Sequence, residues 1–146
     1  DPSDHLNLCG LTIGVQTGTA QEESVNTFSQ DCKKAGKPEI EVRSYSTQSE
    51  ATTALAGSTL DAVYSDSTVA GYAVETTGGQ VETVGEIEDA LPQGIVLTKN
   101  DPALTKAIQA AVQYLMDSGI WQKILDAWGI EGAALTTAAL NPPVEK

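Results

Sequence analysis

Two short polar segments hold the residues best suited to binding a small charged molecule. Residues 16–21 read Q-T-G-T-A-Q and directly follow an apolar, β-branched run. Gly18 would let the backbone approach a ligand closely, and a helix starting at Thr19 would offer free N–H groups at its positive dipole end. Such a helix start can bind a carboxylate, although an ordinary capped helix without a ligand explains the same residues.

The second segment, residues 64–68, reads Y-S-D-S-T and also follows an apolar run. Asp66 stands where a strand would give way to a helix, so its carboxylate can cap that helix. It can instead accept hydrogen bonds from a cationic group such as an ammonium. An anion-binding helix start beside a lone carboxylate would match a zwitterionic amino acid, provided that the two segments are neighbours in the fold.

Residue patterns for catalysis or metal binding are missing. His5 is the single histidine and precedes the first expected strand, and one histidine with two cysteines is too few for a zinc site. No serine stands in a nucleophile-elbow motif. Trp121 and Trp128 are seven residues apart on one expected helix, where core packing is a simpler role than stacking on a ligand. We therefore expect no catalytic residue, metal or cofactor.

Strands and helices alternate around the two polar segments. Period-two and apolar runs predict strands at residues 11–16, 40–45, 60–65, 81–87 and 94–99. Helices are predicted at residues 19–34, from Thr47 or Ser49 to about Gly57, and at residues 67–75. Thr19 and Glu22 have the spacing of a capping box. The alternation predicts an α/β fold with a mostly parallel sheet and helices on both faces, whose strand ends carry the binding site.

The pattern changes near Asp101, where two consecutive helices replace the alternation. Asp101 and Pro102 are a typical helix start, and Gly119 suits the end of that helix. The apolar residues recur at helical spacing in both helices: Leu104, Ile108, Val112 and Leu115, then Ile120, Trp121, Ile124, Leu125 and Trp128. The chain from residue 131 onward is predicted to form an irregular tail.

The net charge and the two cysteines limit the possible binding partners and the cellular compartment. A net charge of −12 disfavours nucleic acid and anionic lipid as partners. Cys9 and Cys32 flank one strand–helix unit, which can bring its ends together. A disulfide between them would stabilise the fold by about 3 kcal/mol and would require an oxidising compartment. Two buried free thiols are the alternative.

Four segments together resemble the bacterial solute-binding proteins for polar amino acids, known as family 3. They are L-C-G-L-T-I-G-V-Q-T-G-T (8–19), A-G-S-T-L-D-A-V-Y-S-D (56–66), G-I-V-L-T-K (94–99) and D-S-G-I-W-Q-K-I-L-D-A-W-G (117–129). The resemblance spans residues 8–129 and implies a lobe of the type II periplasmic-binding-protein fold. Residues 1–98 would be the second ligand-binding lobe. Residues 99–146 would be C-terminal helices and a tail that return to a first lobe absent from this chain.

The resemblance also implies roles for individual residues. Thr19 and the backbone of Ala20 match positions that hold the α-carboxylate of the ligand, and Asp66 matches the acceptor of its α-ammonium. Gln16 and Ser65 match positions that face the cleft. Ala20 departs from the family pattern because it replaces a frequent hydroxyl residue. The expected ligand-binding set is Gln16, Gly18, Thr19, Ala20, Ser65 and Asp66.

The function that this resemblance implies is the substrate-binding component of an ABC-type amino-acid importer, with no enzymatic activity. Its partners would be an amino acid, an ABC permease in the membrane, and a first lobe or another chain against the C-terminal helices. The protein would be extracytoplasmic and, at full length, a lipid-anchored lipoprotein. One alternative is the ligand-sensing domain of a receptor, which membrane-spanning flanks in the full gene would reveal. Another is a dehydratase on the same scaffold, which would need a further acid or base in the cleft.

Overall fold

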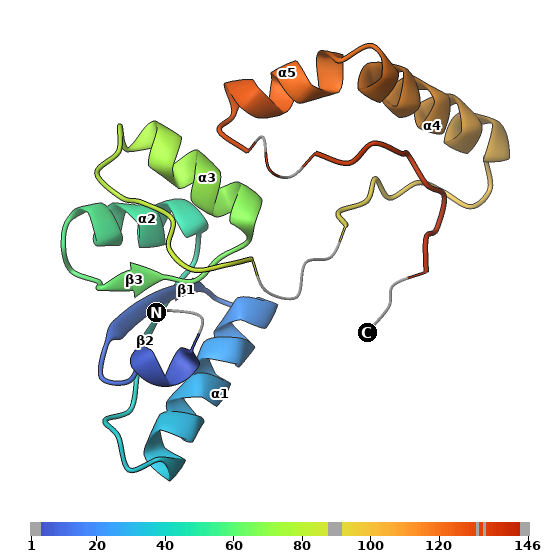
Figure 1. The fold of residues 1–146 in the computed structure, drawn as a ribbon. Coiled ribbons are helices and arrows are strands. Elements are labelled where there is room, and N and C mark those ends of the chain that lie inside the picture. Colours follow the sequence, from blue (N-terminus) through green and yellow to red (C-terminus); the bar gives the residue numbers. More distant parts are fainter. Residues whose placement is uncertain (1–3, 88–91, 131, 133, 144–146) are drawn as a thin grey trace. The chain divides into compact units, whose positions relative to one another are not determined.

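The computed structural model describes residues 4–87, 92–130, 132 and 134–143 (Figure 1). It divides into two compact units, Asp1–Glu86 and Ile87–Lys146. Each unit is described by itself below. The expectation that a ligand-binding lobe extends to residue 98 stays a prediction.

The first unit is built on a three-stranded parallel sheet. Its strands are β1 (Thr12–Gln16), β2 (Glu41–Tyr45) and β3 (Ala62–Val63), in the order β2-β1-β3. Residue Ile13 of β1 is paired with Val42 of β2 and with Ala62 of β3. The sheet confirms the predicted α/β class, followed by C-terminal helices as expected.

Helices cover both faces of this sheet. A short 3₁₀ helix η1 (His5–Asn7) precedes β1, and the α-helices are α1 (Ala20–Lys34), α2 (Gln48–Ala56) and α3 (Ser67–Thr76). Figure 1 shows α1 on one face and α2 and α3 on the other. The predicted helices agree with these bounds to within a residue or two. This agreement follows from local capping residues, such as the complete capping box that Thr47 and Glu50 form at α2.

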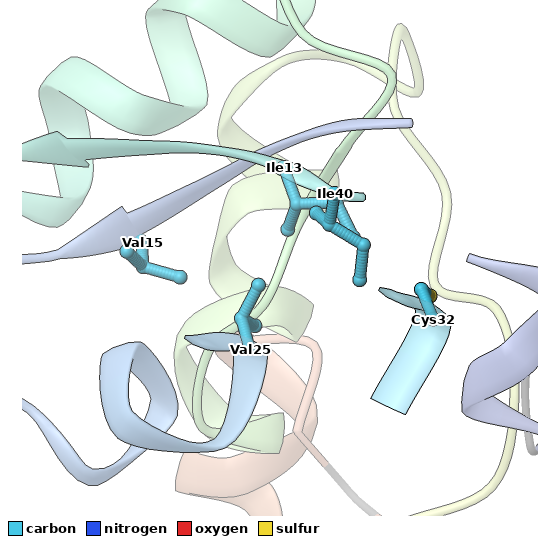
Figure 2. Close-up of a cluster of buried hydrophobic side chains, with 5 residues drawn as sticks. All are labelled: Ile13, Val15, Val25, Cys32 and Ile40. Carbon is cyan, nitrogen blue, oxygen red and sulfur yellow. The ribbon is translucent and has the colours of Figure 1, made fainter. Parts of the chain in front are cut away.

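Alternate residues of β1 form the core between the sheet and α1. Ile13 and Val15 are buried against Val25 and Cys32 of α1, and Ile40 completes the cluster (Figure 2). The residue between them, Gly14, faces the other way. A Cβ placed on Gly14 would lie 2.5 Å from Cδ1 of Leu60, so the chain leading into β3 packs directly on the backbone of β1.

A disulfide joins Cys9 to Cys32, with a Cα–Cα distance of 5.6 Å. It links the chain just before β1 to the last turn of α1, and Cys32 is fully buried in the core. Lys37 Nζ adds a 2.9 Å hydrogen bond to the carbonyl of Leu6. The disulfide predicted from the two cysteines is therefore present, and the segment leading into β1 is fixed against α1.

The second unit consists of α4 (Pro102–Asp117), α5 (Ile120–Ala127) and the chain after them. Asp101 caps α4 by accepting from the N–H of Leu104 at 2.9 Å, and Gly119 adopts φ +72° in the turn between the helices. Gln113 holds the tail against α4, donating to the carbonyl of Thr136 at 3.2 Å and accepting from the N–H of Ala138 at 2.9 Å. No described helix has the length and apolarity needed to cross a membrane.

Two predicted strands are absent from the structure. Residues 81–87 and 94–99 have irregular backbone, and the side chain of Val96 is 95% exposed. Both segments are apolar enough for strands, but a strand needs a hydrogen-bonded neighbour, and no described strand pairs with either segment. The local sequence pattern therefore predicted two strands for which no described strand elsewhere in the chain provides a hydrogen-bonding partner.

Candidate ligand-binding site

The two polar segments lie side by side because they follow neighbouring strands. Tyr64, just after β3, donates from its N–H to the carbonyl of Gly14 in β1 at 3.0 Å. Beyond the strand ends, Gln21 Nε2 donates to Oδ1 of Asp66 at 2.8 Å. The neighbouring placement that the binding hypothesis required is thus present at the carboxyl edge of the sheet, where open α/β sheets bind their ligands.

The turn from β1 into α1 is shaped by Gly18 and Thr19. Gly18 has φ +77°, a left-handed conformation that favours glycine. Thr19 is the N-cap residue of α1, and its Oγ1 accepts from the N–H of Glu22 at 3.3 Å while donating to the carbonyl of Gln16 at 2.7 Å. These bonds hold the first turn of α1 directly above the end of β1.

The capping box predicted for Thr19 and Glu22 is incomplete. The Glu22 carboxylate accepts from the N–H of Gly18 at 2.8 Å and from the hydroxyl of Ser44, and makes no described bond to the N–H of Thr19. Ser44 lies on β2, so a non-local partner draws the carboxylate past the cap. The hydrogen bond from Ser44, and then that from Gly18, lower the pKa of Glu22, which keeps it charged.

As a result, the start of α1 presents free donors. In α2, by contrast, Glu50 accepts from the N–H of its N-cap residue Thr47 at 3.0 Å. Within the described part of the chain, the N–H groups of Thr19, Ala20 and Gln21 have no acceptor. Adjacent free N–H groups at the positive end of a 15-residue helix can bind a carboxylate.

Asp66 occupies the N-cap position of α3, but its side chain makes no capping hydrogen bond. Only its backbone carbonyl supports the helix, accepting from the N–H groups of Val69 and Ala70 at 3.0 and 2.9 Å. A side-chain cap is typically worth about 1 kcal/mol, which α3 forgoes. Of the two roles that the sequence left open for this carboxylate, the structure therefore does not show the cap.

The Asp66 carboxylate is accordingly available to a ligand. One oxygen accepts from Gln21, and the other has no partner among the described residues. Asp66 is exposed, as are Gly18 and Ala20, whereas Gln16, Thr19 and Ser65 are partly buried beside them. Ser65 donates weakly to the carbonyl of Asp66 at 3.4 Å. All six expected residues therefore lie at or just beyond the carboxyl ends of β1 and β3, a region that we call the candidate face.

Sequence reasoning missed two residues of this face, Gln21 and Ser44. Gln21 stood inside the singled-out segment but had no assigned role, because its partner Asp66 is 45 residues away. Ser44 had no recognisable signal at all. Among the described residues, no group of three histidine, cysteine, aspartate or glutamate side chains is placed to hold a metal ion. The chemistry that the face offers is recognition of a carboxylate and of a cation beside it.

A sequence comparison relates this chain to a known binding protein. The chain is 40% identical over 141 residues to the arginine-binding protein ArgT of Corynebacterium glutamicum. The alignment covers 96% of this chain and 46% of that protein, so the chain spans about half the length of the curated relative it matches. No family model matches the chain. The relative is a binding protein.

Proposed function

We propose that this chain is the second lobe, with the C-terminal helices, of the substrate-binding component of an ABC-type amino-acid importer, and that its ligand is arginine. One observation carries the proposal. The free N–H groups at the start of α1 lie near Asp66, whose carboxylate does not cap α3, and the chain is a homologue of an arginine-binding protein. These groups complement the two charges that every free amino acid carries.

In this proposal the α-carboxylate of arginine accepts hydrogen bonds from the N–H groups of Thr19 and Ala20. The α-ammonium donates to Asp66, whose second oxygen has no described partner. Gly18 has no side chain, and nothing lies within 4 Å of the position its Cβ would occupy, so the ligand has room to approach the backbone there. Gln16 and Ser65 lie beside the ligand, and a first lobe completes the pocket and closes over it by a hinge motion.

The same proposal assigns the setting and the partners. The disulfide between Cys9 and Cys32 supports an oxidising, extracytoplasmic location. The full-length protein would be lipid-anchored at the cell surface and would deliver arginine to a membrane permease. The C-terminal helices would pack on the first lobe. The net charge of −12 argues against nucleic acid as a partner.

Calorimetry on the two-lobed protein tests this function. Asp66→Ala should weaken arginine binding by at least about 2 kcal/mol, because a desolvated ammonium loses its charged partner. Asp66→Asn should be nearly as harmful, since it removes the charge and keeps the shape. Glu75→Gln, on the same helix α3, is the matched control and should bind normally. Unchanged affinity in both Asp66 variants, with native circular dichroism, would contradict the proposal.

The chain alone should bind arginine weakly, with a millimolar Kd or weaker. One helix start and one carboxylate supply only part of a pocket, and a millimolar Kd corresponds to about −4 kcal/mol. Titration of this chain with arginine, followed by NMR at the amides of Thr19 and Ala20, measures it. Micromolar binding to a monomer of this chain would overturn the two-lobed site.

A further inference from the structure

The side chain of Gln21 makes the one direct hydrogen bond described between the segment after β1 and the carboxylate of Asp66. The bond is 2.8 Å long and joins two different helices, α1 and α3. A carboxylate only accepts, so the amide must present its NH₂ group, and its carbonyl oxygen then points elsewhere. Gln21 is partly buried and Asp66 is exposed, so the bond lies at the solvent-accessible surface where a ligand can reach the carboxylate.

Among the described α-helices, α3 is the one whose N-cap residue has a side chain suited to capping but does not use it; α5 starts at Gly119, which has no side chain. Thr19, Thr47 and Asp101 all use their side chains to cap α1, α2 and α4. Asp66 is an equally good capping residue, yet its carboxylate makes no bond to α3. Its one described side-chain partner is Gln21. The contact with Gln21 therefore takes the place of the cap.

We infer that Gln21 is a positioning residue for ammonium recognition: it holds the Asp66 carboxylate away from α3 and toward the ligand. One oxygen is fixed by the amide, and the other has no partner among the described residues. Without Gln21 the carboxylate would turn to the N–H group of Thr68, which has no acceptor among the described residues, and cap the helix. Ligand binding would then have to break that cap first. This inference rests on the proposed function for its binding consequences, but the Gln21–Asp66 contact does not.

The first test is arginine binding by the two-lobed protein. Gln21→Leu keeps the length of the side chain and removes the amide. It should weaken binding of L-arginine about tenfold and change binding of des-amino arginine, which lacks the α-ammonium, less than twofold. In the Asp66→Asn background, Gln21→Leu should change arginine binding less than twofold, since the two residues act through one contact. Gln30→Ala, on an exposed position of the same helix, is the control and should leave both ligands unaffected.

Equal losses for arginine and its des-amino analogue, or an equal loss with and without the Asp66→Asn change, would overturn the inference. Either result would mean that Gln21 acts on the ligand or on the fold by another route. A merely structural role for Gln21 predicts such uniform losses. The ratio of the affinities for arginine and des-amino arginine therefore distinguishes a positioning role from a structural one.

The second test needs no ligand and uses this chain. Gln21→Leu should free Asp66 to cap α3, so amide hydrogen exchange at Thr68 should become at least threefold slower. Unchanged or faster exchange at Thr68 would overturn the inference. If the wild-type protein binds no arginine, the proposed function fails, and this exchange measurement still decides whether Gln21 positions Asp66.

Discussion

The two units of the chain differ in how far they bury their apolar side chains. In the first unit, β1 and α1 bury Ile13, Val15, Val25 and Cys32 almost completely, and the candidate site stands on that core. In the second unit, Leu125 is the one buried large apolar residue that the structure describes, while Trp128 is 52% exposed. The first unit therefore has its own buried core beneath the candidate site. The second unit instead leaves the apolar sides of its amphipathic helices partly exposed to solvent.

The largest expected effect comes from a matched pair of truncations, one in each unit. Ile13→Ala should destabilise the first unit by about 2–5 kcal/mol, because Ile13 is 2% exposed and a cavity would remain. Ile124→Ala should cost less than about 1 kcal/mol, because that side chain is already 42% exposed. Urea unfolding followed by circular dichroism measures both.

Fluorescence adds an independent reading of the same pair. Both tryptophans, Trp121 and Trp128, lie in the second unit, so their emission follows that unit alone. Ile13→Ala should shift the dichroism transition far more than the fluorescence transition. Equal shifts by both probes would mean that the two units unfold as one, and the contrast between them would be lost.

The second prediction concerns the exposed face formed by Ile120, Ile124 and Trp128, which recur every four residues along α5 and at its C-cap and are 39–52% exposed. Covering the exposed parts of three such side chains is worth on the order of 3 kcal/mol. In a solution of this chain alone, we expect a second copy to cover this face. Light scattering over a concentration series should show association.

A charge on that face should abolish the association. Ile124→Glu places a charge among the apolar residues, while Ala110→Glu adds the same charge at an exposed position outside the face. Only the first substitution should restore a monomer. A wild-type chain that remains monomeric at every concentration would show that the second unit needs no partner surface.

In both units the sequence predicted the helices better than the strands, for a physical reason. The helix bounds depend on local caps, such as Thr47 with Glu50 and Asp101 before Pro102, which are visible within four residues. A strand at residues 94–99 depends on a pairing edge elsewhere in the chain. No described strand provides one, so the apolar pattern alone predicted β structure wrongly.

The candidate site shows the same division between local and non-local information. The sequence singled out Thr19 and Asp66, but it left Asp66 open between capping and ligand binding. That choice depends on Gln21, which is 45 residues away, and sequence spacing cannot report such a contact. The incomplete capping box at Glu22 has the same origin, because the competing hydroxyl of Ser44 lies on another strand.

The third prediction addresses the disulfide, which belongs to the first unit alone. Reducing the bond between Cys9 and Cys32 should destabilise that unit by about 3 kcal/mol, because the bond closes a loop between residues 23 apart. The dichroism transition should move to lower urea, and the tryptophan transition should stay in place. Thiol labelling of the denatured, unreduced chain provides the control and should find no free cysteine.

A tryptophan transition that moves together with the dichroism would contradict this expectation. It would show that the second unit draws its stability from the first. Free thiols in the unreduced chain would instead remove the support for an oxidising compartment.

The smallest expected effect compares two neighbouring glutamates on α1, Glu22 and Glu23. Hydrogen bonds from Ser44 and Gly18 lower the pKa of Glu22 below its ordinary value of 4.5, whereas no described group bonds the carboxylate of Glu23. A carboxylate whose pKa is lower in the folded than in the unfolded protein stabilises the fold above its unfolded pKa, here about 4.5. This stabilisation is lost as the pH falls through the lower pKa of the folded state. Glu22→Gln should therefore lower the urea midpoint slightly at pH 7, and the difference from wild type should shrink as the pH is lowered toward 3. Glu23→Gln, which removes a neighbouring carboxylate from the same helix, is the control for the loss of one charge. A Glu22→Gln effect that is the same at both pH values would mean that the carboxylate charge adds nothing to the turn that presents the Thr19 and Ala20 N–H groups.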